Sequence, residues 1–90
     1  MNLGINQLAL LKRCYQKKEI TIRDVTIYYR IPMDTKDNEQ RLLAILEKLE
    51  LRGFLRKTSY AYPIGFTLTN LGKIIVEENT NIKSKMGVNN

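Results

Sequence analysis

The sequence predicts an α+β fold with a three-helix core, a two-stranded β-hairpin and a C-terminal helix. Three observations predict it. Apolar residues recur at steps of three and four, which is typical of one side of a long helix: Leu42, Ile45, Leu46 and Leu49. Gly53 follows where a helix end favours a left-handed residue. Phe54–Thr58 and Phe66–Thr69 are then short β-prone runs separated by turn residues, which indicates a hairpin.

Length and composition indicate one small domain. The chain has 90 residues, of which 43% are hydrophobic, enough for a single core. No apolar run approaches the roughly 20 residues that cross a bilayer, and the N-terminus lacks the pattern of a secretory signal. We therefore expect a cytoplasmic protein, in a host cell if it is viral, that does not associate with a membrane.

The charged and catalytic residue types narrow the class of function. Fifteen Lys and Arg against nine Asp and Glu give a net charge of +6, which favours a nucleic-acid partner, although small basic domains also have other roles. The chain has no histidine and one cysteine, Cys14, which excludes a disulfide framework, a Cys-rich zinc site and imidazole catalysis. We expect neither an enzyme nor a cofactor or metal site.

The first helix is predicted over Asn6–Lys18, with Asn2 or Asn6 as its cap. The centre of its apolar stripe is formed by three residues: Leu8, Leu11 and Tyr15. Leu10 and Cys14 widen that stripe to nearly half of the circumference. Such a width fits a helix that covers its own core on one side and a second subunit on the other, with Leu10 and Cys14 at the dimer contact. It fits equally a helix sunk deeply into one small domain.

The second helix begins at a capping box. Thr21 and Asp24 have the spacing at which each side chain bonds the other residue's backbone N–H, and an extended link precedes them. The helix must end by Ile31, because Pro32 disfavours helical geometry in the residue before it. Its inward residues are predicted to be Ile22, Val25 and Tyr29. Two helices joined by the turn at 32–35, the second capped by Asp34 or Thr35, form a helix-turn-helix arrangement.

The chain closes with a fourth helix and a tail. Thr69 or Asn70 can cap this helix, which is predicted to reach about Asn79. Its buried side is predicted to consist of Leu71, Ile74 and Ile75. From Thr80 the sequence is polar and without periodicity. The predicted organisation is a domain over residues 1–79 and a mobile basic tail over residues 80–90.

This order of elements is that of a winged helix-turn-helix domain, and three motifs strengthen the resemblance. The run from Leu46 to Lys57 resembles the L-x-x-L-x-x-x-G-h-h-x-R/K pattern of MarR-like and PadR-like regulators. Phe66–Gly72 is similar to the second wing strand and the L-T-x-x-G start of the next helix, and Thr21–Val25 to the S-x-x-D-L opening of the scaffold helix. The match spans roughly residues 5–78, and the chain most resembles the small winged-helix proteins of archaea and their viruses.

The resemblance implies sequence-specific binding of double-stranded DNA, with the third helix in the major groove and the hairpin, or wing, on the backbone or minor groove. Gln40 could then pair with adenine, Arg41 with guanine, and Ala44 could contact a thymine methyl. The candidate residues of this helix are Lys36, Gln40, Arg41, Ala44 and Lys48. The alternative for each of them is a solvated helix face.

The third helix and the hairpin differ in their charge. Between Asp34 and Arg52 there are four basic and five acidic residues, which weakens the attraction of the third helix to DNA, whereas no acid occurs from Leu51 to Val76. The predicted wing contacts to phosphate are Arg52, Arg56, Lys57 and Tyr60. Tyrosines at a hairpin tip are also good protein-contact residues.

Two functions are therefore expected from the sequence. The first is a transcriptional regulator that binds DNA as a homodimer, because one recognition helix reads too few base pairs for useful specificity. In it, the first helix is the expected dimer surface. The second is a winged-helix module that binds another protein through Tyr60, Tyr62 and the wing.

Overall fold

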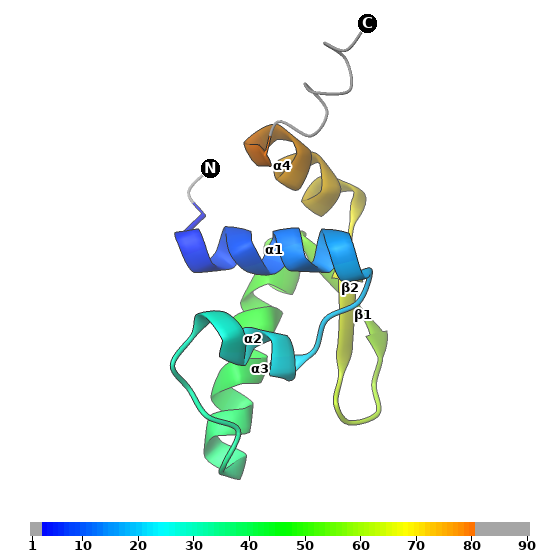
Figure 1. The fold of residues 1–90 in the computed structure, drawn as a ribbon. Helices are drawn as coiled ribbons and strands as arrows, with labels where there is room; N and C mark the ends of the chain where they lie inside the picture. Colours follow the sequence, from blue (N-terminus) through cyan, green and yellow to red (C-terminus); the bar gives the residue numbers. More distant parts are fainter. Residues whose placement is uncertain (1–2, 81–90) are drawn as a thin grey trace, which may run out of the picture.

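The computed structural model describes residues 3–80, and within them the α+β class is confirmed. Four helices and one two-stranded antiparallel hairpin occur in this part of the chain: α1 (Ile5–Lys17), α2 (Ile22–Tyr28), α3 (Lys36–Leu51), β1 (Leu55–Ser59), β2 (Gly65–Leu68) and α4 (Asn70–Thr80). Figure 1 shows α1 across the middle, with α4 at one end of the molecule. The start of α3 and the hairpin tip lie at the other end. This layout is consistent with a winged-helix arrangement.

Helix α1 begins one residue earlier than predicted. Its cap is Gly4, whose backbone N–H donates to Gln7 Oε1 at 3.0 Å. The predicted cap at Asn6 is wrong because Asn6 lies inside the helix, and Asn2 lies outside the described residues. The helix ends at Lys17, and Lys18 turns the chain with a φ of 82°. That turn directs the linker toward the hairpin.

The wide apolar stripe of α1 is used within one chain. Leu10, Leu11 and Cys14 are fully buried, whereas Leu8 and Tyr15, which were predicted at the centre of the stripe, are only partly buried. Helix α1 is packed against α2, α4 and β2 at once. Leu10 and Cys14 therefore belong to the core of a single subunit, and the burial leaves them no surface for the predicted dimer contact.

Helix α2 carries the predicted capping box. The backbone N–H of Thr21 donates to Asp24 Oδ2 at 2.9 Å, and Thr21 Oγ1 accepts from the N–H of Arg23 at 3.2 Å. The helix ends at Tyr28, so Tyr29 is an extended, partly buried residue beyond it rather than a helical core residue. The inward prediction holds for Ile22 and Val25, which are buried together with Asp24.

Helix α3 follows its prediction closely. Thr35 Oγ1 accepts from the backbone N–H of Asn38 at 3.1 Å, and Leu42, Leu46 and Leu49 are fully buried. Gly53 ends the helix with a φ of 87°, the left-handed conformation that a Cβ would strain.

Strand β2 of the hairpin is hydrogen-bonded along both of its edges. Leu55 pairs with Leu68 and Lys57 with Phe66, and each strand is shifted by one residue from the predicted range. On the other edge of β2, Ile20 exchanges two backbone hydrogen bonds with Phe66, at 2.9 and 2.8 Å. The α1–α2 linker therefore extends the sheet by one residue beside Phe66, which is one residue from the tip end of β2.

Helix α4 turns inward a side that shares only Ile75 with the predicted one, and Ile75 is partly buried against the core. Thr69 caps it, since its Oγ1 accepts from the N–H of Gly72 at 3.1 Å. Gly72 and Val76 are buried, whereas Leu71 and Ile74 are 41% and 48% exposed, so their predicted burial is wrong. The reason is a close backbone contact, because a Cβ on Gly72 would lie 2.3 Å from the Phe54 carbonyl oxygen. The helix includes Thr80, and residues 81–90 of the predicted tail lie outside the described residues.

Candidate nucleic-acid interface

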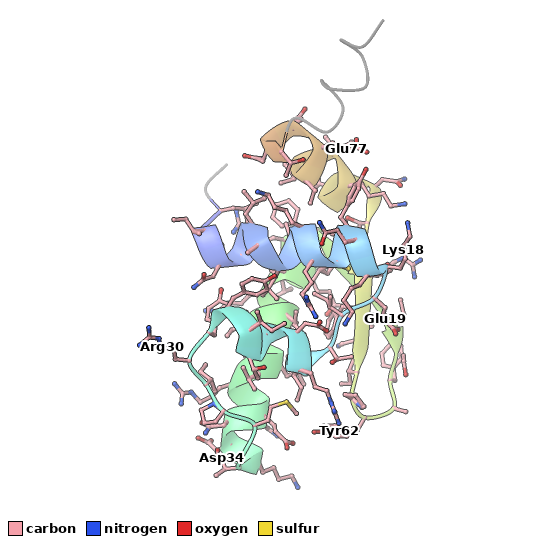
Figure 2. All side chains as sticks on the ribbon, viewed as in Figure 1. Lys18, Glu19, Arg30, Asp34, Tyr62 and Glu77 are labelled. Atoms are coloured by element: carbon pink, nitrogen blue, oxygen red, sulfur yellow. The ribbon has the colours of Figure 1, made fainter. Side chains whose placement is uncertain are left out.

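The solvent face of α3 contains every helix residue that the sequence nominated. Because Leu42, Leu46 and Leu49 face the core, the opposite side of the helix is turned to solvent. All five nominated side chains are exposed: Lys36, Gln40, Arg41, Ala44 and Lys48. In Figure 2, Asp34 before the start of α3 and Tyr62 at the hairpin tip lie at the same end of the molecule. The helix start and the hairpin tip thus present one composite surface.

Two side-chain hydrogen bonds in series fix one edge of this surface. Arg41 Nη1 donates to Asn38 Oδ1 at 3.1 Å, and Asn38 Nδ2 donates to Asp34 Oδ1 at 2.9 Å. The guanidinium is therefore held on the side of the helix that faces the turn before α3. Its remaining donors can still reach an acceptor in solvent.

The other edge is a groove between α3 and the hairpin tip. It has a volume of about 170 Å³ and is mainly apolar. Its lining consists of Ile22, Lys36, Glu39, Gln40, Leu43, Tyr62 and Ile64. Partial burial raises the pKa of Tyr62, and the charge and hydrogen bonding of Glu39 raise it further. Glu39 is thus turned toward the hairpin tip.

The acidic residues at the end of α3 are also turned toward the hairpin. Lys57 Nζ lies 3.4 Å from Glu47 Oε2 and 3.6 Å from Glu50 Oε1. Desolvation alone would lower the pKa of Lys57, but the hydrogen bonds and charges of the two carboxylates outweigh it and raise that pKa. The charge count did not anticipate these contacts. Glu39, Glu47 and Glu50 are partly buried, and the exposed charged residues of α3 are three cations and one acid: Lys36, Arg41, Lys48 and Asp37.

The two basic residues of β1 point in opposite directions. Successive side chains of a strand alternate between its faces, so Lys57 shares the face of the buried Leu55 and Arg56 lies on the other. The Lys57 side chain is only 20% exposed, whereas Arg56 is exposed and paired in register with Thr67. Of these two predicted phosphate contacts in β1, Arg56 faces solvent and Lys57 faces α3.

The remaining nominated hairpin residues differ in their surroundings. Arg52 is exposed, and its guanidinium carbon lies 5.2 Å from the centre of the Phe54 ring. Tyr60 is 78% exposed at the hairpin tip, with Lys57 Nζ 5.7 Å from its ring centre. Tyr62, which the sequence suggested for protein contact, is 64% exposed. The tip is therefore aromatic and open to solvent.

One polar cluster between α1 and α2 was not predicted from the sequence. Asp24 is buried, and its Oδ1 accepts from Arg13 Nε at 2.5 Å and from Lys17 Nζ at 2.8 Å. Burial alone would raise the pKa of Asp24, but hydrogen bonds from Lys17, the Thr21 amide and Arg13 together lower it. The capping box was the available signal, since it fixes where Asp24 sits, but it does not reveal the two cations of α1.

A scan against protein-family models finds no match, and a comparison with curated proteins finds none. Among residues 3–80, no helix is long and apolar enough to cross a membrane. The same residues contain no group of three or more His, Cys, Asp or Glu that could hold a metal ion.

Proposed function

We propose that this protein is a winged-helix transcriptional regulator that binds a specific double-stranded DNA site. Helix α3 would enter the major groove, and the hairpin would serve as the wing on the backbone or minor groove. The observation that carries the proposal is the composition of the solvent face of α3. Its three cations and Gln40 are exposed together, while Glu39, Glu47 and Glu50 are turned toward the hairpin.

The hairpin supports the proposal through its outward residues. Arg56 and Tyr60 are exposed and suit contacts to phosphate oxygens, the first through charge and the second as a hydroxyl donor. Arg52 lies at the junction of α3 and β1, where the two contact surfaces meet. Lys57 is assigned a different role, because its contacts with Glu47 and Glu50 orient the hairpin against α3.

The regulator would act as a homodimer. One short recognition helix contacts only a few base pairs, so a second copy on a two-fold-related half-site supplies the missing specificity. The dimer contact must use residues other than Leu10 and Cys14, since both are buried within one chain.

The test is a DNA-binding titration with the site selected from random duplexes. Gln40→Ala and Arg41→Ala should each weaken binding to the selected site by roughly 1–3 kcal/mol and leave nonspecific duplex binding nearly unchanged. Lys12→Ala, an exposed residue of α1, is the control and should not change preference among sequences. The proposal would be contradicted if the selection enriched no sequence or if the affinity for DNA did not depend on salt.

A second candidate function rests on the hairpin tip. Tyr60 and Tyr62 are exposed beside an apolar groove, which are features of a protein-contact site. In this case the protein would bind another protein without reading DNA. Random-duplex selection separates the two functions, because only the regulator enriches a defined site, and a palindrome would also reveal the two-fold dimer.

A further inference from the structure

We propose that Asn38 is a positioning residue that sets where Arg41 meets DNA, and so decides which base pair Arg41 reads. Asn38 acts through its side-chain amide, which links Arg41 to Asp34 before the start of α3. The inference deepens the proposed function, on which its DNA part rests, by naming a residue that determines specificity without contacting a base.

The chemistry of its two neighbours fixes the orientation of the Asn38 amide. A guanidinium can only donate hydrogen bonds, and an ionised carboxylate can only accept them. The amide oxygen must therefore accept from Arg41 Nη1, at 3.1 Å, and the amide nitrogen must donate to Asp34 Oδ1, at 2.9 Å. The amide of Asn38 supplies both the acceptor and the donor that these two neighbours require.

The start of α3 holds this amide in place. Asn38 lies in the first turn of the helix, and its backbone N–H donates to Thr35 Oγ1 at the cap, at 3.1 Å. Asn38 is partly buried, whereas Asp34 and Arg41 on either side of it are exposed. Asn38 and Arg41 are three residues apart and so share one side of the helix. The amide is therefore a fixed acceptor for a long side chain that otherwise extends into solvent.

The position of the guanidinium decides what it contacts on DNA. A mobile arginine on this surface would also meet phosphate oxygens, which carry no sequence information. The bond to Asn38 keeps Arg41 beside the turn before α3, at the edge opposite Gln40, which lines the groove with the hairpin tip. We therefore expect Arg41 and Gln40 to read different base pairs.

Arg41 can read guanine without releasing Asn38. A guanidinium has five N–H donors, and the bond to Asn38 uses one of them. Paired hydrogen bonds to O6 and N7 of guanine need two donors. Because the side chain is already restrained, it loses less conformational entropy when it binds. The restraint of one long side chain should change affinity by about two- to tenfold.

Nuclear magnetic relaxation of the arginine Nε–Hε groups in the full, DNA-free chain tests the restraint. In the wild type, Arg41 should be more ordered than Arg30, which is exposed and points away from the ribbon in Figure 2. Asn38→Ala should lower the order parameter of Arg41 to that of Arg30. Asp37→Ala, at an exposed position in the same helical turn, is the matched control and should leave Arg41 unchanged.

Two results of this measurement would overturn the inference. The first is a wild type in which Arg41 is as mobile as Arg30. The second is an equal loss of order at Arg41 in Asn38→Ala and Asp37→Ala, because Asn38 would then have no particular hold on the guanidinium. Thermal unfolding checks that both variants are folded.

An exchange of two side chains provides a rescue. In the double variant Asp34→Asn, Asn38→Asp, the carboxylate at position 38 can accept from Arg41 and also from the amide at position 34. Both hydrogen bonds and the net charge are then kept. Arg41 should be about as ordered as in the wild type. A double variant in which Arg41 is as mobile as in Asn38→Ala would overturn the linking role of position 38.

DNA binding tests the effect on specificity. At the base pair where Arg41→Ala removes the preference for guanine, Asn38→Ala should reduce that preference by about two- to tenfold and leave other positions unchanged. In the Arg41→Ala background, Asn38→Ala should have no further effect there, because Asn38 acts only through Arg41. Additive losses would overturn the positioning role, since Asn38 would then contact DNA independently.

The two measurements separate the failure of this inference from the failure of the proposed function. If Asn38 orders Arg41 in the free protein but random-duplex selection enriches no site, the proposed function fails and the contact between the two residues stands. If a site is enriched but Asn38→Ala leaves its guanine preference unchanged, the positioning role fails and the regulator stands.

Discussion

Within residues 3–80, two ion-pair clusters join neighbouring elements, and the central residue of one is an acid whereas that of the other is a base. In the first, the carboxylate of Asp24 on α2 is held by the cations of Arg13 and Lys17 on α1. In the second, the ammonium of Lys57 on β1 is held by Glu47 and Glu50 on α3. The Asp24 side chain is 5% exposed, whereas the Lys57 side chain is 20% exposed. The side chains of its partners Glu47 and Glu50 are more exposed than Lys57.

Burial decides what each cluster contributes. A buried carboxylate without its partners is costly, so the Asp24 cluster should contribute to the stability of the scaffold. A lysine among solvated carboxylates gains little free energy, so the Lys57 cluster should act mainly on orientation. The comparison shows that two clusters of similar size have different roles. The Asp24 cluster stabilises the fold, and the Lys57 cluster orients the hairpin of the proposed DNA-binding surface.

The largest expected effect comes from the buried cluster. Asp24→Asn should lower the free energy of unfolding by about 2 kcal/mol, because the amide accepts poorly from two cations and the Thr21 N–H. Urea denaturation measures the change. Glu78→Gln, the same change at an exposed carboxylate of α4, should stay within about 0.5 kcal/mol. If both variants lost a similar free energy of unfolding, the Asp24 cluster would contribute no more to stability than an exposed carboxylate.

The pH dependence of stability should distinguish the clusters further, because one loses its contribution at low pH and the other at high pH. The pKa of Asp24 is lowered in the folded state, so its contribution is present above the unfolded value of about 3.9 and is lost as pH falls through the folded pKa. The pKa of Lys57 is raised, so its contribution is present below about 10.4 and is lost as pH rises through the folded pKa.

Denaturation across pH measures both windows. The stability difference between wild type and Asp24→Asn should shrink below pH ~4, and that between wild type and Lys57→Ala should shrink above pH ~10. Taking the difference removes contributions that the wild type and the variant share. A difference that stays constant across its window would show that the named cluster is not its source.

The smallest expected effect concerns DNA and rests on the proposed function. Arg56→Ala should reduce the slope of log K against log salt by about 1, because it removes an exposed phosphate contact. Lys57→Ala should leave the slope unchanged and lower affinity slightly for all sequences, since Lys57 contacts Glu47 and Glu50. Equal slope changes would mean that Lys57 leaves the carboxylates and reaches phosphate.

The sequence was sufficient wherever a short-range rule decides the structure. The capping box of Thr21 and Asp24 and the left-handed Gly53 were predicted from residues at most three positions apart, and both are confirmed. Of the two predicted caps of the third helix, Asp34 and Thr35, the structure selects Thr35. The buried stripe of α3 was equally clear, because the helix is long enough for one apolar period to dominate.

Long-range contacts were not predictable in the same way. The spacing of apolar residues in α4 fits two different sides of the helix, and Gly72 selects between them through its contact with the Phe54 carbonyl. The charge count treated the acids of α3 as one group, although Lys57 pairs with two of them only after the chain has turned back at Gly53. The width of the α1 stripe likewise could not distinguish a neighbouring helix from a second subunit.

The bridge between Ile20 and Phe66 has a mechanical consequence. Because the α1–α2 linker and β1 both pair with β2 at Phe66, near the tip end of the strands, the paired part of the hairpin cannot tilt without breaking main-chain bonds to the linker. Bending is then confined to the outer segment around Tyr60 and Tyr62. Amide exchange should be slow at Ile20 and Phe66 and fast at the tip, so the hairpin would behave as a rigid stem with a pliant end.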